Sequence, residues 1–172
     1  MAQNVFLGLV SGVKKWITAI TTSAGAGDAG KIVATNGAGV VDITLLPGGL
    51  ANTIVAVCSE NLAAGDAVNL YDATGTPKLR KADASSAAKR CHGFVLTSYT
   101  SGQSATAYKD GKLTGLSSLT DGGEYYLSTT PGGITTDVSG YTTSGNLIQH
   151  VGVAHDTTAL QIAIDSDPAQ IA

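Results

Sequence analysis

The sequence has 172 residues, a formal net charge of −3 and only 13% charged residues. This length favours one core-forming domain preceded by an arm, and the weak negative charge excludes the basic footprint of a typical nucleic-acid-binding protein. Charged residues make up roughly 25% of ordinary soluble domains. Small Ala, Gly, Ser and Thr side chains take their place here, which lowers the cost of burying the surface against another protein. The composition therefore favours a chain that works in an assembly over a soluble monomer.

The beginning of the chain carries no targeting segment that we can identify. Its longest early apolar run, Val5–Val10, is far short of the roughly 20 residues that span a bilayer. Lys14 and Lys15 follow it without a small-residue cleavage site, so we predict neither a membrane span nor a secretory signal. Cys58 and Cys91 do not make a disulfide framework, and we expect synthesis in a reducing, intracellular compartment.

Residues 5–20 fit two patterns. Their apolar residues follow a helical stripe, but Val5–Val10 and Val13–Ile17 on either side of Ser11-Gly12 also fit a short hairpin. We favour the hairpin, because Gly8, Gly12 and the β-branched residues weaken a helix.

The segment that follows is rich in Gly, Ala and Ser and predicts a linker from Thr21 to Gly30. Lys31–Thr35 predicts a short strand that ends at the Asn36-Gly37 turn. Pro47-Gly48-Gly49 then breaks the chain. We place a domain boundary here, with an extended N-terminal arm at residues 1–50 and a β-domain at residues 51–172.

The linker contains a motif that resembles two nucleotide-binding patterns. Gly25–Lys31 satisfies both G-x-G-x-x-G and G-x-x-x-x-G-K, which cradle phosphate at the start of a helix. Ile32, however, stands where a P-loop has Ser or Thr, and Asp28 would put a negative charge in the cradle. Only a few residues precede the Asn36-Gly37 turn, so no helix of useful length fits. We therefore predict no cofactor site.

From Thr53 onward the pattern is one of short strands and tight turns. Leu160, Ile162 and Ile164 alternate with more polar residues, which indicates a half-buried strand. The spacing of the Gly-, Asp- and Pro-containing turns is typical of an all-β barrel or sandwich. Only Asp83–Arg90 could be helical, for one or two turns, with Asp83 as a possible N-cap.

The β-domain also repeats itself, at about residues 60–116 and 117–166. Gly65–Tyr71 and Gly93–Leu96 return in altered form as Gly122–Ser128 and Gly152–Ala154. Leu70, Gly75 and Gly93 correspond to Leu127, Gly132 and Gly152. Such spacing predicts one supersecondary unit used twice and packed against its copy.

No residue pattern announces catalysis or metal binding. The chain lacks C-x-x-C, H-E-x-x-H and G-x-S-x-G, and its acids sit beside glycines in predicted turns. The histidines are His92, His150 and His155, and the acids considered are Asp110, Asp121 and Glu124. We predict no catalytic or metal-binding residues; a small hydrolase using His92 or His155 is the enzyme alternative.

Two further groups of residues have a structural and a binding interpretation. The basic cluster has no interleaved aromatic residues, which favours a solvated or interface face; it comprises Lys78, Arg80, Lys81, Lys89 and Arg90. Five tyrosines could form a sugar-binding surface, or could fill the core of a β-domain. They are Tyr99, Tyr108, Tyr125, Tyr126 and Tyr141.

Several segments resemble a family of small tailed-bacteriophage virion proteins. In the first fifty residues they are Thr22–Gly25, Asp28–Val33, Asp42 and Leu46-Pro47. In the β-domain they are Glu60–Asn69, Lys81–Ala84, Gly93–Leu96, Tyr125–Thr135, Val151–Ala154 and Leu160–Ile162. The resemblance covers most of residues 22–164 and consists mainly of turn and strand signals.

The resemblance implies a capsid decoration, or cement, protein on the outside of an icosahedral head. The implied partners are the major capsid protein and further copies of this chain, with a trimer favoured, and the family offers no catalytic residues to carry over. We expect the arm to bury apolar residues against these partners, namely Phe6, Leu7, Leu9, Trp16, Ile32, Val33 and Leu45. The alternative is a head or tail fibre protein that binds host glycans.

Overall fold

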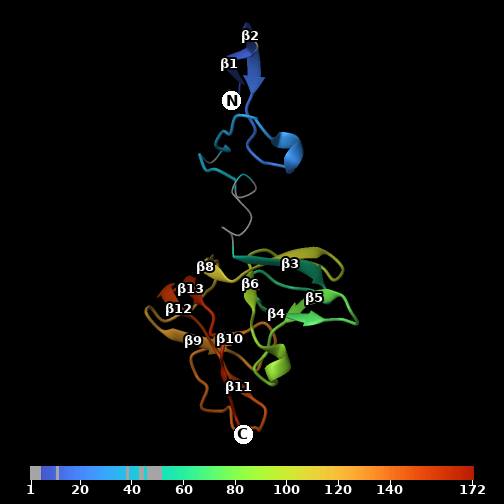
Figure 1. Ribbon diagram of the computed structural model, residues 1–172. Coiled ribbons are helices and arrows are strands. Elements are labelled where there is room, and N and C mark those ends of the chain that lie inside the picture. The colour runs from blue at the N-terminus through green and yellow to red at the C-terminus, as the bar shows by residue number, and fades with distance from the viewer. Residues whose placement is uncertain (1–4, 11, 38, 43–44, 46–51) are drawn as a thin grey trace. The chain divides into compact units, whose positions relative to one another are not determined.

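The computed structural model describes residues 5–10, 12–37, 39–42, 45 and 52–172. The chain divides into two compact units, Met1–Ala51 and Asn52–Ala172. The predicted all-β class is confirmed, since the named elements are strands and two short 3-10 helices, η1 (Ala26–Asp28) and η3 (Ala87–Lys89) (Figure 1). The break expected at Pro47-Gly48-Gly49 lies outside the described residues.

The N-terminal unit contains the hairpin that the sequence favours over a helix. Strands β1 (Val5–Val10) and β2 (Val13–Thr18) pair antiparallel, and Gly12 takes a positive φ of 78° in the turn between them. A side chain at Gly12 would be strained there, so this glycine suits the turn.

The prediction of a strand at Lys31–Thr35 is wrong. Only a single bridge forms there, between Ile20 and Val33, and it is closed by hydrogen bonds from Ile20 N to Ile32 O and from Ala34 N to Ile20 O. The neighbouring glycine-rich loop contributes η1 and no strand that could extend the pairing.

The C-terminal unit begins with a closed five-stranded barrel. Its strands are β3 (Thr53–Cys58), β4 (Ala67–Asp72), β5 (Pro77–Lys81), β6 (Gly93–Val95) and β7 (Ser104–Tyr108). The order around the barrel is β3-β5-β4-β6-β7, and β7 pairs with β3 to close it. The β3–β5 pair is parallel and short, while the other pairs are antiparallel.

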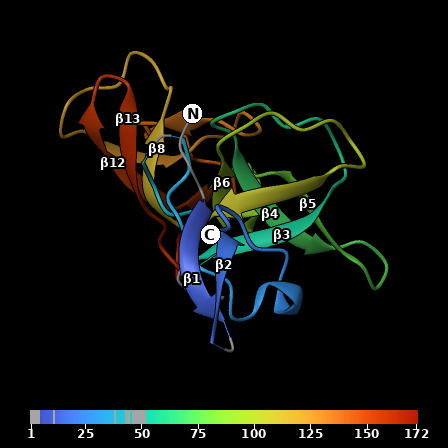
Figure 2. The ribbon, with the colours of Figure 1, turned by 90° about the horizontal axis from the view of Figure 1, so that it is seen from above.

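A five-stranded open sheet follows and lies beside the barrel (Figures 1 and 2). It contains β8 (Asp110–Thr114), β9 (Glu124–Leu127), β10 (Ile134–Thr135), β12 (His150–Asp156) and β13 (Ala159–Ala163). The remaining strands, β11 (Leu147–Ile148) and β14 (Ala169–Gln170), pair with each other.

The open sheet repeats the strand connections of the barrel. Its order is β10-β9-β12-β13-β8, and the barrel read from β5 has the corresponding order β5-β4-β6-β7-β3. The two sheets differ because β3 pairs with β5 and closes the barrel, whereas β8 and β10 do not pair. This places β8 at the start of the second sheet. The division between the sheets therefore falls near Lys109. The internal repeat in the sequence predicts it after residue 116, because the sequence of β8 resembles that of β3 too weakly to be matched.

Two equivalent glycines have the same physical role in the two sheets. A Cβ at Gly93 would lie 3.0 Å from Tyr108 O and 3.1 Å from Ala107 Cβ on β7. A Cβ at Gly152 would lie 2.9 Å from Leu160 Cγ and would also clash with the carbonyl oxygen of Gln161 on β13. In both sheets the neighbouring strand approaches too closely for a side chain.

Apolar side chains form two core clusters. One fills the barrel and contains Val68, Leu79 and Val95. The other includes Phe94 of the barrel together with Leu127 and Leu160 of the open sheet. The alternation predicted for the last long strand is confirmed, since Leu160 and Ile162 are buried while Gln161 is exposed.

The helical turn expected within Asp83–Arg90 is present as η3, but its predicted cap is wrong. Ser86 is the N-cap residue, and its side chain accepts a hydrogen bond from Ala88 N. Asp83 instead accepts from Ser85 N at 3.0 Å and from Lys89 Nζ at 2.9 Å. The backbone N–H of the buried Ala84 is bonded to Ser128 O, so the helical turn starts only after this residue.

Candidate functional site

The β1–β2 hairpin presents an exposed apolar pair. Leu7 and Trp16 are directly opposite each other in the register, so their side chains lie on the same face of the two strands. The side chain of Leu7 is 59% exposed and that of Trp16 is 73% exposed. Val13 at the turn is 56% exposed. Val13 lies on the opposite face, with Lys15 and Ile17, because successive strand residues alternate. We call Leu7 and Trp16 the hairpin surface.

On the opposite face of the hairpin, a side chain of the hairpin itself packs over the backbone. Ile17 lies over Gly8, where an added Cβ would clash with its side chain, and Ile17 is half-buried. Successive strand residues point to opposite faces, so packing of Ile17 directs Trp16 away from it. Lys14 and Lys15 are exposed beside them. A two-stranded hairpin is marginally stable in water by itself, and an exposed Trp on one is well suited to contact a partner.

The structure does not gather all seven arm residues into one surface. Ile32 and Val33 are exposed near the Ile20 bridge, and Leu45 is half-buried. Phe6 pairs with Ile17 and Leu9 with Lys14 through the backbone, while their side chains lie outside the described residues.

The glycine-rich loop is arranged around its own carboxylate. Asp28 accepts a hydrogen bond from Ala24 N at 2.7 Å and forms an ion pair with Lys31. The hydrogen bond from Lys31, followed by that from Ala24, lowers the pKa of Asp28. The carboxylate of Asp28 therefore takes up a backbone N–H donor of this loop and the charge of Lys31.

The three histidines have separate environments. His155 is exposed and lies 3.2 Å from Asp156, whereas the ring of His150 meets the ring of Tyr126 edge to face at 5.6 Å. His92 is half-buried beside Asn69. Within the described part of the chain, no group of three or more His, Cys, Asp or Glu side chains could hold a metal ion.

Both cysteines are free thiols in the core. Cys58 is 1% exposed and its thiol donates to Thr100 O, and Cys91 is equally buried. Burial raises the pKa of Cys91 to about 12. Since the thiolate is the nucleophilic form of cysteine, Cys91 is poorly suited to nucleophilic chemistry.

The five tyrosines do not form one surface. Tyr125 and Tyr141 are buried, and the Tyr141 hydroxyl donates to Leu127 O at 2.7 Å. Tyr99 is half-buried and its hydroxyl accepts from Thr106 N, while Tyr108 packs against the core. Tyr126 lies beside His150. Most of these rings therefore serve packing, and a sugar-binding surface made of all five is not present.

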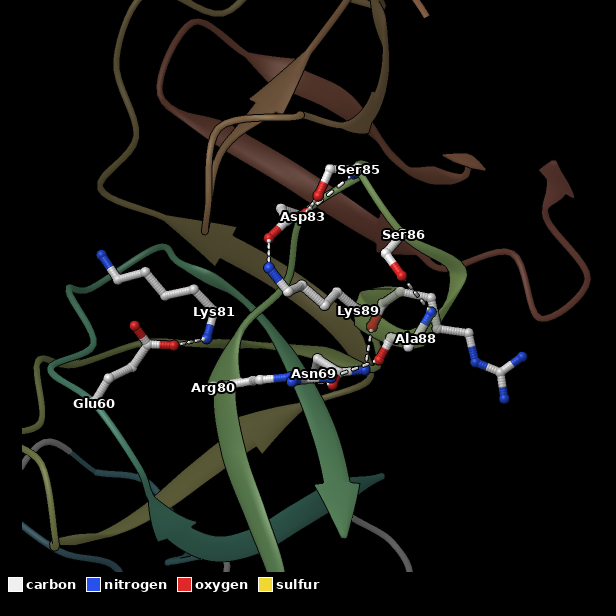
Figure 3. Close-up of polar contacts among 10 residues, drawn as sticks. Glu60, Asn69, Arg80, Lys81, Asp83, Ser85, Ser86, Ala88 and Lys89 are labelled. Carbon is white, nitrogen blue, oxygen red and sulfur yellow. Dashed lines mark hydrogen bonds and ion pairs between the residues drawn. The ribbon is translucent and has the colours of Figure 1, made fainter. Parts of the chain in front are cut away.

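The basic cluster is largely tied to the fold (Figure 3). Arg80 donates to Asn69 Oδ1 at 2.9 Å and to Ala88 O at 2.7 Å, and its guanidinium lies 4.2 Å from the centre of the Tyr71 ring. Tyr71 lies on β4, the strand next to Arg80, and no local sequence signal marks this contact. Lys89 forms an ion pair with the buried Asp83 at 2.9 Å.

Asp83 combines burial with strong hydrogen bonding. Burial by itself would raise its pKa, but hydrogen bonds from Ser85 and Lys89 outweigh burial and leave the pKa lowered. The chain on both sides of Asp83 joins the two sheets, through hydrogen bonds from Gly132 N to Ala82 O and from Ala84 N to Ser128 O. Asp83 and Lys89 thus hold a structural connection.

Comparisons with known proteins find no matching family model and no matching curated protein. Over the residues that the structure describes, no helix has both the length and the apolar character needed to cross a membrane.

Proposed function

We propose that this chain is a structural protein of a bacteriophage virion, and that it binds the outer surface of the capsid as a decoration protein. The proposal rests on the resemblance of residues 22–164 to that family and on the low content of charged residues. The observation that carries it is the hairpin surface, because Leu7 and Trp16 are paired on one face and remain exposed. Buried aromatic anchors dominate the binding energy of protein interfaces.

The proposed mechanism is mechanical. Each copy would insert its hairpin surface between neighbouring capsid subunits, and apolar area removed from water contributes roughly 25 cal/mol per Å² before ordering costs. Many copies acting together would favour the assembled shell by mass action. The C-terminal unit, with its own core clusters, would be displayed on the head surface.

The test uses phage heads assembled without this protein. We expect the purified full chain to bind such heads, and Leu7→Ser and Trp16→Ser to weaken binding at least tenfold each, since hot-spot residues contribute about 2 kcal/mol or more. Trp16 is the single tryptophan, so its fluorescence should shift to shorter wavelength when it is buried.

Val55→Ser is the matched control, because Val55 is an exposed apolar residue of β3 (64% exposed) outside the hairpin. Circular dichroism establishes that each variant is folded. Wild-type affinity of both hairpin variants, or absence of binding by the unmodified chain, would refute the proposal.

Copy number separates the proposal from its alternatives. A decoration protein is present in tens to hundreds of copies per particle and a fibre protein in few, so quantitative mass spectrometry of purified virions distinguishes them. The fibre alternative rested on a tyrosine surface, and the structure distributes those tyrosines between core and surface. A small hydrolase using His92 or His155 would lose its activity in His92→Ala or His155→Ala, whereas the proposal expects both variants to bind heads unchanged.

A further inference from the structure

A cavity of about 300 Å³ opens in the C-terminal unit, lined by residues from both the barrel side and the open-sheet side. Its polar lining comes from the start of β3, the chain before β6, the β7–β8 connection and the chain after β13. These residues are Asn52, Arg90, His92, Lys109, Asp165 and Ser166. The volume is at the lower end of the range for small-molecule sites.

Gln149 lines the cavity, and both hydrogens of its amide are already used by the protein. Its Oε1 accepts from Cys91 N at 2.7 Å, and its Nε2 donates to Cys91 O at 3.0 Å and to Asp165 O at 2.8 Å. Gln149 therefore holds the walls in place, and recognition falls to the side chains around it.

The protonation state of His92 follows from its neighbours. Two donors are aimed at its Nδ1, Leu70 N at 3.0 Å and Asn69 Nδ2 at 3.3 Å. The Asn69 amide cannot be reversed, because its Oδ1 accepts from Arg80 Nε and its Nδ2 donates to Arg90 O. Nδ1 is therefore an acceptor, and the proton of the neutral imidazole is on Nε2.

This assignment leaves two donors facing each other. Arg90 Nε points its hydrogen at His92 Nε2, 3.1 Å away. Because the hydrogen bond from Leu70 N makes Nδ1 the acceptor, the neutral ring carries its proton on this same Nε2. Two N–H groups do not bond to each other, but an oxygen anion placed beside both would accept from each. The geometry thus lacks an acceptor at this point of the cavity.

The positively charged side chains around this point also lack an anionic partner. In the described chain neither Arg90 nor Lys109 forms an ion pair with a carboxylate. Both cations lie close enough to His92 to reinforce burial in lowering its pKa. Asp165, the one acid of the lining, uses one oxygen to accept from Asp167 N at 2.9 Å. Its other oxygen, together with the Ser166 hydroxyl, offers positions for a hydroxylated ligand.

We propose that this cavity binds an acidic sugar of the hexuronate class, whose carboxylate accepts from Arg90, Lys109 and His92 Nε2. The sugar hydroxyls donate to Asp165 and exchange hydrogen bonds with Asn52 and Ser166. A bare oxyanion would satisfy the cations but would face Asp165 without a donor, whereas a hexuronate supplies both an anion and hydroxyl donors. The inference goes beyond the proposed virion role and does not rest on it.

The test is a titration of the full chain, followed by amide chemical shifts, with sodium glucuronate as the probe. We expect saturable binding of glucuronate, with shifts concentrated at residues 90–92, 109 and 165–166. Glucose, which lacks the carboxylate, should not bind, and sulfate, which lacks the hydroxyls, should bind at least tenfold more weakly. Raising the salt concentration should weaken glucuronate binding.

Variants locate the site. Arg90→Gln and Lys109→Gln should each lower glucuronate affinity at least tenfold, while Lys112→Gln, a lysine of β8 outside the cavity, should leave it unchanged. The amide spectrum of each variant reports on its fold, and the comparison of ligands on the unmodified chain needs no variant. Absence of saturable binding, equal affinity for sulfate, tighter binding of a tetraglutamate peptide, or full affinity in both cavity variants would each overturn the proposal.

Discussion

Replacement of Gln149 by methionine tests how the two sheets are joined. Gln149 is 1% exposed, and its amide provides the hydrogen bonds of both the N–H and the C=O of Cys91, which belongs to the barrel side of the domain. Methionine keeps the length of the side chain and removes both the donor and the acceptor. Cavity formation therefore contributes little to the difference between the two proteins.

The expected cost follows from the groups that lose their partners. Each buried polar group left without a hydrogen bond costs roughly 1–3 kcal/mol. With two backbone groups of Cys91 affected, Gln149→Met should lower the free energy of unfolding by about 2–5 kcal/mol. The third bond, from Gln149 Nε2 to Asp165 O, is only part-buried and should add less.

Urea unfolding of the full chain, followed by circular dichroism, measures this quantity. Gln161→Met is the matched control, since Gln161 is an exposed residue of β13 and should change stability by less than about 0.5 kcal/mol. The m-value should stay constant if the two variants unfold as the wild type does. A loss below about 1 kcal/mol for Gln149→Met would show that water replaces the amide and that Gln149 does not join the sheets.

Three further predictions concern the same domain. The pKa of Asp83 is lowered on folding, so its charge stabilises the fold above the unfolded value of about 3.8, and this stability is lost as the pH falls through the folded value. Asp83→Asn should therefore be less stable than wild type at pH 7, and its free energy of unfolding should depend less on pH below 4 in acid titrations. An unchanged pH dependence would contradict this. Asp121→Asn, in an exposed turn, is the control. Gly152→Ala should cost about 1–3 kcal/mol or more by overpacking, whereas Gly140→Ala, with open space around it, should be nearly neutral; equal thermal stability of the two would refute the close-approach argument. Finally, Cys91, whose pKa burial raises to about 12, should resist iodoacetamide at pH 8 in the native protein and react after unfolding, and rapid native labelling at Cys91 in a peptide map would count against its burial.

Residue patterns predicted those elements whose signal is local. The hairpin at residues 5–18 follows from β-branched residues around a Gly turn, and the Leu160–Ile162 alternation follows from one buried face. Expectations failed where a distant segment decides the outcome. The strand at Lys31–Thr35 became a single bridge because its partner is one residue, Ile20, and not a strand.

The cavity could not be predicted from the sequence. Arg90 and Lys109 are ordinary surface cations in the sequence, and Asn52 and Asp165 are far from them along the chain. Of the polar lining, the sequence singled out only Arg90, in a basic cluster, and His92, as a histidine. The acceptor state of His92 depends on donors from β4. The exposure of Leu7 and Trp16 on one face follows from their pairing in the hairpin, which the sequence alone does not fix.

The sequence by itself determined the all-β class, the hairpin and the internal repetition, because each is written in short-range periodicity or in recurring turn residues. Tertiary structure decided that one copy of the repeat closes into a barrel while the other stays open, since closure depends on whether the β3–β5 pair can form across the barrel. It also decided which polar groups meet at the cavity, because hydrogen bonds between segments 58 residues apart, such as Cys91 and Gln149, leave no local pattern.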